Sequence, residues 1–304
     1  MKLDLKAQQF GTLNRQKLHG IMFMSCGIFL FAVVSTIAKI VSTKYPANEI
    51  IFFRMLFGII PAALMFRFCN IPKKAFTLHR FWEHFLRAVL ALGSMGLFFS
   101  GLPHLPLSAA VTLHYTEAIF IALLAVMFLG ERLRVPMVIA LVAGSVGVAL
   151  IASFSSDENT SLLGVGLVLL SAVFNAGSVI QIKKLSRTEE SAVIVLYFTI
   201  IATIFSGCSL WVSWTAPNMT DLGYMGLLGL TAGTGQLMLT IAFRNAAASM
   251  LAPFSYFGIV WAIILEYLIW GEVVSMQAIV GSIVIIGSAF YLSMSGKSRV
   301  NEAA

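Results

Sequence analysis

Long runs of apolar residues, separated by short polar stretches, occupy most of this chain. Each run approaches the roughly 20 residues that an α-helix needs to cross the hydrocarbon core of a bilayer. The runs are continuously apolar rather than alternating, so they predict helices and not the strands of a membrane barrel. We predict ten transmembrane helices, at 20–42, 49–68, 84–102, 107–129, 135–154, 162–182, 191–213, 222–243, 247–270 and 275–295.

The composition fits an all-α integral membrane protein and excludes a soluble one. Hydrophobic residues make up 59% and charged residues 11% of the sequence, whereas soluble domains average about 45–50% and about 25%. Ten spans leave no room for a soluble catalytic domain. The formal net charge of +7 is explained by basic cytoplasmic loops, so no nucleic-acid partner is expected. The three cysteines are scattered and predict neither a disulfide framework nor a metal site.

Basic residues predict the orientation of the chain. With the N-terminus in the cytoplasm, nearly all Lys and Arg residues outside the predicted spans fall on the cytoplasmic side, and Lys44 falls on the outer side. Cytoplasmic loops of membrane proteins carry this excess of positive charge. We therefore expect a multi-pass protein of the cytoplasmic (inner) membrane, surrounded by the lipid bilayer, with cytoplasmic tails at 1–19 and 296–304.

The two halves of the chain, 20–154 and 162–295, share a pattern. Gly130-Glu131 ends the fourth predicted span and Gly271-Glu272 ends the ninth, and Tyr115 and Tyr256 precede them by equal distances. Each half has five predicted helices, an odd number, so the second half must be inverted relative to the first. Inverted repeats are typical of secondary transporters, whose substrate site lies near the midplane between the repeats.

Several segments resemble a known family. The segments LPLSAA at 105–110, YTEAIF at 115–120 and LGERL at 129–133, with WGE at 270–272 in the second half, are similar to the EamA family of the drug/metabolite transporter superfamily. The resemblance covers essentially the whole chain. It implies ten helices in two inverted EamA-like repeats and transport of a small metabolite. The positions of Arg54 and Arg87 are similar to those in one subgroup of the family, which includes S-adenosylmethionine, riboflavin and metallophore transporters.

Glu117 is the leading candidate for function. It lies about ten residues into the predicted span 107–129, roughly 15 Å deep at 1.5 Å per residue. An ionisable residue at that depth is costly and marks a functional site by default. It could couple transport to protons or bind a cationic group of the substrate, or it could be a structural acid. His114 lies three residues earlier and so on the same helix face, where it could share the proton.

Other polar and aromatic residues within the spans are further candidates, each with a structural alternative. Tyr115, Tyr256 and Trp261 could stack on a planar substrate, or they could simply pack. Asn175 and Gln236 could bind substrate or join two helices. Arg54 and Arg87 could bind a carboxylate or phosphate, but each lies close enough to a membrane edge for its side chain to snorkel to the surface.

These residues predict a secondary transporter of a small organic metabolite, amino-acid-like or S-adenosylmethionine-like, that works by alternating access and is proton-coupled or an exchanger. The alternatives are a riboflavin or metallophore transporter and a lipid-linked phosphate flippase. An enzyme is not expected, because the chain has no paired carboxylate motif and no nucleophile with a positioned base. No cofactor is expected, and the protein is predicted to be a monomer or homodimer. The sequence leaves substrate identity and direction open.

Overall fold

The computed structural model describes residues 2–42, 44–68, 80–101, 104, 113–152, 162–271, 276, 279–281, 283–288 and 290–291. These residues are almost all helical, and no strand occurs among them, which confirms the predicted all-α class. The named elements are α1 (Lys2–Val41), α2 (Ala47–Phe68), α3 (Phe81–Gly101), α5 (Glu117–Leu129), α6 (Val135–Ala152), α7 (Leu162–Leu185), α8 (Ser191–Ser209), α9 (Met219–Asn245), α10 (Ala248–Leu251), η4 (Ala252–Tyr256) and α11 (Phe257–Trp270).

Six helical stretches of the described chain are long and apolar enough to cross a membrane. They are Gln16–Ala38, Ala47–Arg67, Leu162–Leu185, Ser191–Ser209, Met219–Asn245 and Ala248–Ile269. Shorter apolar helices cover Glu117–Leu129, Val135–Gly147 and Ile279–Ser288. A multi-pass helical membrane protein is thereby confirmed. The predicted spans 107–129 and 275–295 lie partly, and the tail 296–304 wholly, outside the described residues.

Helix boundaries differ from the predicted spans where local chemistry intervenes. α1 runs on from the membrane through the predicted N-terminal tail. The predicted span 247–270 is broken into α10, η4 and α11, and Pro253 lies in the broken turn. Proline has no backbone N–H to donate and clashes with the preceding turn of an α-helix, so it favours such a break.

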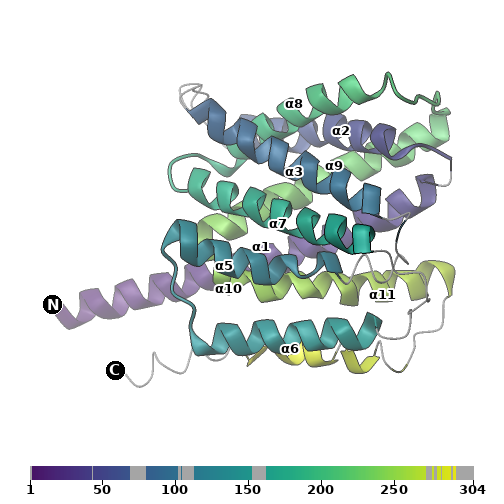
Figure 1. The fold of residues 1–304 in the computed structure, drawn as a ribbon. Helices are drawn as coiled ribbons and strands as arrows, with labels where there is room; N and C mark the ends of the chain where they lie inside the picture. Colours follow the sequence, from purple (N-terminus) through teal and green to yellow (C-terminus); the bar gives the residue numbers. More distant parts are fainter. Residues whose placement is uncertain are drawn as a thin grey trace.

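The helices pack as a layered bundle (Figure 1). α1 lies along α9, α3 lies along α7, and α2 packs against both α8 and α9. α5 packs on α7, and α11 packs on α1. Figure 1 shows α2, α3 and α8 towards one side of the bundle and α6 at the opposite side. The candidate residues on α5, α7 and α9 are therefore carried by the middle of the bundle.

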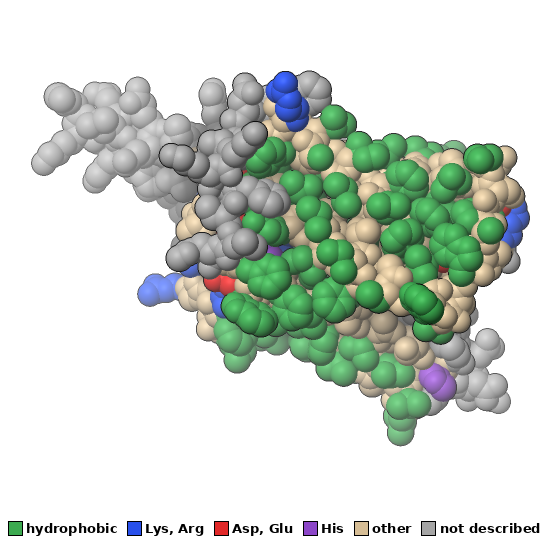
Figure 2. Space-filling view, turned by 90° about the horizontal axis from the view of Figure 1, so that it is seen from above, with side chains coloured by type: hydrophobic (Ala, Val, Ile, Leu, Met, Phe, Trp, Pro, Cys, Tyr) green, Lys and Arg blue, Asp and Glu red, His purple; other side chains and the backbone are tan. Residues whose placement is uncertain are grey.

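The outer surface suits a lipid environment. Large hydrophobic side chains such as Leu162, Trp211, Val212 and Met127 are mostly exposed. Figure 2 shows hydrophobic side chains over most of one face, with Lys and Arg side chains near its margins. Apolar surface of this extent on a soluble protein would mark an interaction site, and here it is the surface that a bilayer covers.

Two glycines end helices in the same way. Gly130 after α5 and Gly271 after α11 have φ of 66° and 68°, in the left-handed region that glycine adopts without strain. The neighbouring Glu131 accepts hydrogen bonds from the backbone N–H groups of Ala248 and Ser249 at 3.1 and 3.0 Å. Its role at this helix start is architectural. Glu272 lies outside the described residues.

Candidate functional site

Glu117 is the first residue of α5 and meets α7 from the second half of the chain. Its Oε2 accepts a hydrogen bond from the side-chain amide of Asn175 on α7. The same oxygen lies 3.5 Å from Nε2 of His114, and 13% of the Glu117 side chain is exposed. Three of the predicted site residues are thus brought together, and the expected contact between His114 and Glu117 is present.

The cluster has a connection on the other side of the imidazole. Nδ1 of His114 lies 2.9 Å from Oγ of Ser171 on α7, and that hydroxyl also lies 2.9 Å from the carbonyl of Val168, to which it donates. Because the hydroxyl proton of Ser171 is donated to Val168, its oxygen accepts a hydrogen bond from Nδ1–H of His114. This hydrogen-bond network therefore fixes which imidazole nitrogen carries the proton. In a neutral His114, the lone pair on Nε2 then faces the carboxylate.

The predicted aromatic residues lie nearby but differ in their surroundings. The rings of Tyr115 and Tyr256 have centroids 6.5 Å apart at 48°. Tyr256 is 1% exposed, and its hydroxyl lies 2.9 Å from Oγ of Ser145 on α6. Trp261 packs edge-on against Phe29 with centroids 4.8 Å apart. In this conformation Tyr256 is fully packed, whereas Tyr115 and Trp261 are partly buried.

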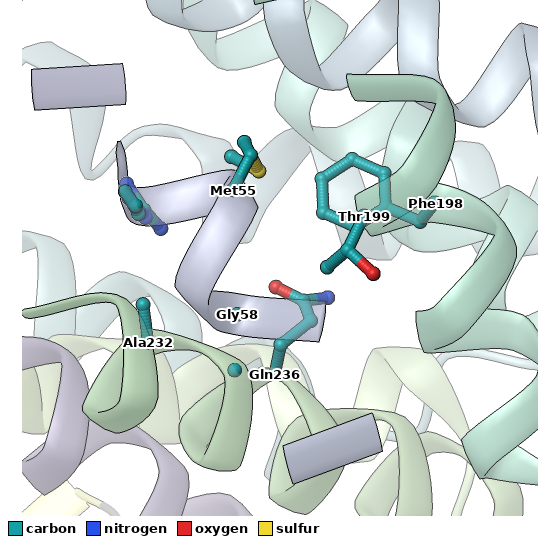
Figure 3. A pocket seen from close by; sticks show the side chains of 8 residues that line it. Met55, Gly58, Phe198, Thr199, Ala232 and Gln236 are labelled. Carbon is teal, nitrogen blue, oxygen red and sulfur yellow. The ribbon is translucent and has the colours of Figure 1, made fainter. Parts of the chain in front are cut away.

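Arg54 and Gln236 lie in a different place, at a pocket between α2, α8 and α9. Figure 3 shows Gln236 from α9 and Thr199 from α8 pointing toward one another across this space, with Met55 from α2 at its edge. The cavity volume is about 10 Å³, close to the space that one water molecule needs and far below the about 300–1,000 Å³ of ordinary small-molecule pockets. A whole metabolite would need the helices to move apart. The lining residues are Arg54, Met55, Gly58, Phe198, Thr199, Ala232, Gly233 and Gln236.

The structure corrects the expectation that Arg87 snorkels to the membrane surface. Its side chain is 0% exposed, because α3 is covered by α7 and α8. Nη1 donates to the carbonyl of Ile194 at 2.7 Å, and the guanidinium lies 4.5 Å from the ring centroid of Phe198. Phe198 also lines the pocket of Arg54, so Arg87 stands beside one wall of that pocket.

Some polar contacts had no signal in the sequence. His84 Nε2 lies 2.8 Å from the carboxylate of Glu189, and the His84 ring stacks on Tyr197 at 4.5 Å. Outside the membrane spans, Glu190 forms an ion pair with Arg244, whose hydrogen bond lowers the pKa of the Glu190 carboxyl. The partners are far apart in sequence, so no local pattern reveals them. Among the described residues, no group of three or more His, Cys, Asp or Glu side chains could hold a metal ion.

Comparison with known proteins places this arrangement in a family. The model of the EamA-like transporter family matches residues 18–153 and again 162–294. The pseudopaline exporter CntI of Pseudomonas aeruginosa is 29% identical over 282 residues, covering 91% of this chain and 97% of the exporter. The S-adenosylmethionine uptake transporter of Rickettsia conorii is 27% identical over 281 residues, covering 90% of this chain and 94% of that protein.

A protein of known crystal structure shares the fold. It superposes with a TM-score of 0.80 at 17% sequence identity, covering 90% of this chain and 98% of the other. The family and both named relatives are transporters and not enzymes, which confirms that prediction. Because the family model matches nearly the whole length, in two parts, this chain belongs to the EamA-like transporter family.

Proposed function

We propose that this protein is a secondary transporter that moves a small organic metabolite, amino-acid-like or S-adenosylmethionine-like, across the cytoplasmic membrane by alternating access. The observation that carries the proposal is the cluster of Glu117, His114 and Asn175, which joins α5 to α7 inside the bundle. The names of the relatives, an S-adenosylmethionine uptake transporter and a pseudopaline exporter, support a small-molecule substrate.

The proposed architecture is ten spans in two inverted repeats, 20–154 and 162–295, with both tails in the cytoplasm. The two separate family matches support it. The packing does so too: if α1 corresponds to α7, α3 to α9, and α5 to α11, then the pair α1–α9 maps onto α7–α3. The pair α5–α7 likewise maps onto α11–α1.

Local features recur at nearly equivalent positions in the two proposed repeats. α5 begins two residues after Tyr115 and α11 begins one residue after Tyr256. Each of these helices ends at a glycine with positive φ. Interrupted helices at matching positions of two repeats are the feature from which transporters build their binding sites. We therefore assign the segments around Tyr115 and Tyr256 to the substrate path.

The position of the Glu117 cluster ties proton binding to motion of the repeats. Glu117 and His114 belong to the first proposed repeat, and Asn175 and Ser171 belong to the second. If the two repeats rock against each other, these contacts must break or shift. A proton or a cationic substrate group held by Glu117 would then favour one conformation over the other, which is the requirement for coupling.

The proposal is tested by a binding screen followed by transport. Purified full-length protein is screened by thermal unfolding against metabolites, since a ligand that binds only the folded state raises the melting temperature. The compounds that stabilise it are then tested for flux in proteoliposomes. We expect at least one to cross the membrane faster than in protein-free vesicles. If no stabilising compound is transported at any pH between 5 and 8, the proposal is wrong.

A second candidate function is favoured by one relative. The pseudopaline exporter covers nearly the whole chain at 29% identity, so export of a pseudopaline-like metabolite is the alternative. Loading the vesicles and following efflux separates the two, because an uptake transporter and an exporter prefer opposite starting gradients. A phosphate-lipid flippase would instead move a labelled lipid between leaflets and would not respond to water-soluble metabolites.

A further inference from the structure

The pocket between α2, α8 and α9 is lined by a guanidinium without a counter-ion. In the described part of the chain Arg54 makes no hydrogen bond and no ion pair, and its recorded contact is with the ring of Phe31 at 5.4 Å. Glu49, the nearest acid along α2, accepts instead from the backbone N–H of Thr215 at 2.9 Å. Arg54 therefore brings its full charge to the pocket.

Arg87 adds a second incompletely paired guanidinium beside the same pocket. It is fully buried, and within the described chain Nε and Nη2 have no hydrogen-bond partner. Three other cations have polar partners: Lys44 pairs with Asp221, Arg244 pairs with Glu190, and Lys183 donates to two carbonyls. Arg54 lines the pocket and Arg87 lies behind its Phe198 wall, so two incompletely paired guanidinium groups flank this space.

Such an arrangement is expensive unless something anionic completes it. Burying a charge without a partner costs several kcal/mol, and more where lipid excludes water. The acid of the first cluster, Glu117, is already engaged by Asn175 and His114. Because no described side chain supplies the counter-ion to Arg54, a ligand is the group that could.

The shape and donors of the pocket indicate which ligand group. α2 and α9 touch backbone to backbone at its edge, since a Cβ on Gly233 would lie 2.5 Å from the carbonyl oxygen of Gly58. Gln236 points into the space from α9 and offers amide N–H donors. The hydroxyl of Thr199 already donates to Val195. A guanidinium fork and an amide donor line the same pocket, and together they match a carboxylate, which accepts two parallel N–H bonds from arginine.

Resting on the proposed transport function, we propose that this pocket holds a carboxylate group of a soluble organic substrate. Arg54 is the binding residue, Gln236 is the second donor, and Arg87 raises the positive potential from behind Phe198 without touching the ligand. In this conformation the cavity holds about one water molecule, so the helices must part for the acid group to enter, and the remainder of the substrate extends between them. The substrate class is narrowed to organic acids and amino acids.

Matched ligands test the assignment on the full-length purified protein. The pairs are S-adenosylmethionine with its decarboxylated form, and citrate with its trimethyl ester. Phosphatidylglycerol, added to the detergent, tests an anionic lipid as the source of the charge. The readout is the apparent Kd from thermal unfolding titrations. Variants are Arg54→Gln, Arg54→Lys and, as the matched control on the same helix, Arg67→Gln, whose side chain is exposed at the end of α2.

In the wild type and in Arg67→Gln, we expect the carboxylate of at least one pair to bind tenfold or more tightly than its partner. In Arg54→Gln this preference falls below twofold. Arg54→Lys keeps the charge but loses the fork, so it retains an intermediate preference. The assignment is overturned if no pair discriminates in the wild type, if Arg54→Gln keeps the full preference, or if phosphatidylglycerol alone stabilises the protein.

Flux of the same compounds separates this assignment from the transport function. If carboxylate binding depends on Arg54 but no compound shows flux, the transport proposal is wrong and the carboxylate site stands. If flux of an organic acid is unchanged in Arg54→Gln, the transport proposal stands and the carboxylate site is wrong. Each variant is first checked by size exclusion and by its ligand-free melting temperature. If Arg54→Gln does not fold, the Arg54→Lys comparison decides: a preference equal to that of the wild type overturns the assignment.

Discussion

His114 is the side chain through which the proposed transporter would respond to pH. Its Nδ1 is held by Ser171 and its Nε2 faces Glu117, so the imidazole is placed to share a proton with the carboxylate. Histidine is the side chain whose ordinary pKa lies closest to physiological pH.

Replacing His114 by Gln should flatten the pH profile of flux. The amide can still bond to Ser171, but it cannot take up a proton. We expect flux of the screened substrate at the optimal pH to fall by less than tenfold, while the variation between pH 5 and 8 shrinks to about the level of protein-free vesicles. Proteoliposome flux at several pH values measures it. A profile identical to that of the wild type would show that His114 takes no part in proton coupling.

The ion pair of Glu190 and Arg244 should give a small acid-dependent contribution to stability. Arg244 lowers the pKa of Glu190, so the pair stabilises the fold above the ordinary glutamate pKa of about 4.3. That contribution is lost as the pH falls through the lower pKa of the folded protein. Both side chains are substantially exposed, and such pairs are worth about 0.2–1 kcal/mol.

The check is the melting temperature of Arg244→Gln in detergent, against the wild type and against Arg67→Gln. Arg244→Gln should melt below the wild type at pH 7, and the gap should narrow as the pH falls below about 4.3. Arg67→Gln should show no pH-dependent gap. A difference between Arg244→Gln and the wild type that stays constant down to pH 3.5 would contradict the stated origin.

At the scale of helices, the contact between α2 and α9 depends on glycine. A Cβ added to Gly233 would lie 2.5 Å from the carbonyl oxygen and 2.9 Å from the Cα of Gly58, and backbone atoms cannot rotate away. A Cβ on Gly226, two turns earlier on α9, would meet the tip of the Phe57 ring at 3.9 Å. The two positions therefore form a matched pair on one helix.

Gly233→Ala should destabilise the protein and Gly226→Ala should not. Forcing apart two packed helices costs about 1–3 kcal/mol, whereas alanine at an unobstructed helix position is favoured over glycine by about 1 kcal/mol. Thermal unfolding of the two variants in the same detergent measures the difference. Equal melting temperatures would mean that α2 and α9 do not approach as closely as described.

The helices were largely predictable from the sequence, but their contacts were not. Continuous apolar runs predict α2, α7 and α9 within a few residues, because lipid forces the backbone to bond within each segment. The prediction failed for Arg87, since depth from a membrane edge does not tell which neighbouring helices cover a side chain. The bond from Asn175 to Glu117 joins helices in different halves, and one sequence contains no information on that pairing.

At the scale of the whole molecule, the proposed inverted repeats predict which loops face which side. The loop at Lys44 should face outwards, and the turn at Arg187 should face the cytoplasm. Lys44→Cys and Arg187→Cys, each made after Cys26, Cys69 and Cys208 are replaced by Ser, test this in intact cells. A membrane-impermeant maleimide should label the first directly and the second only after permeabilisation. The opposite pattern, or labelling of both from outside, would contradict the orientation.

The central claim is that a carboxylate inside the bundle couples transport, and Glu117→Gln tests it most directly. The Gln carbonyl can still accept the bond from Asn175, so the variant should fold, insert and keep a melting temperature close to that of the wild type. Its flux of the screened substrate in proteoliposomes should fall at least tenfold at every pH from 5 to 8. Glu83→Gln should transport normally, because this partly exposed side chain lies at the start of α3 and pairs with Arg80, away from the Glu117 cluster. Flux in Glu117→Gln equal to that of the wild type across this range would contradict the account.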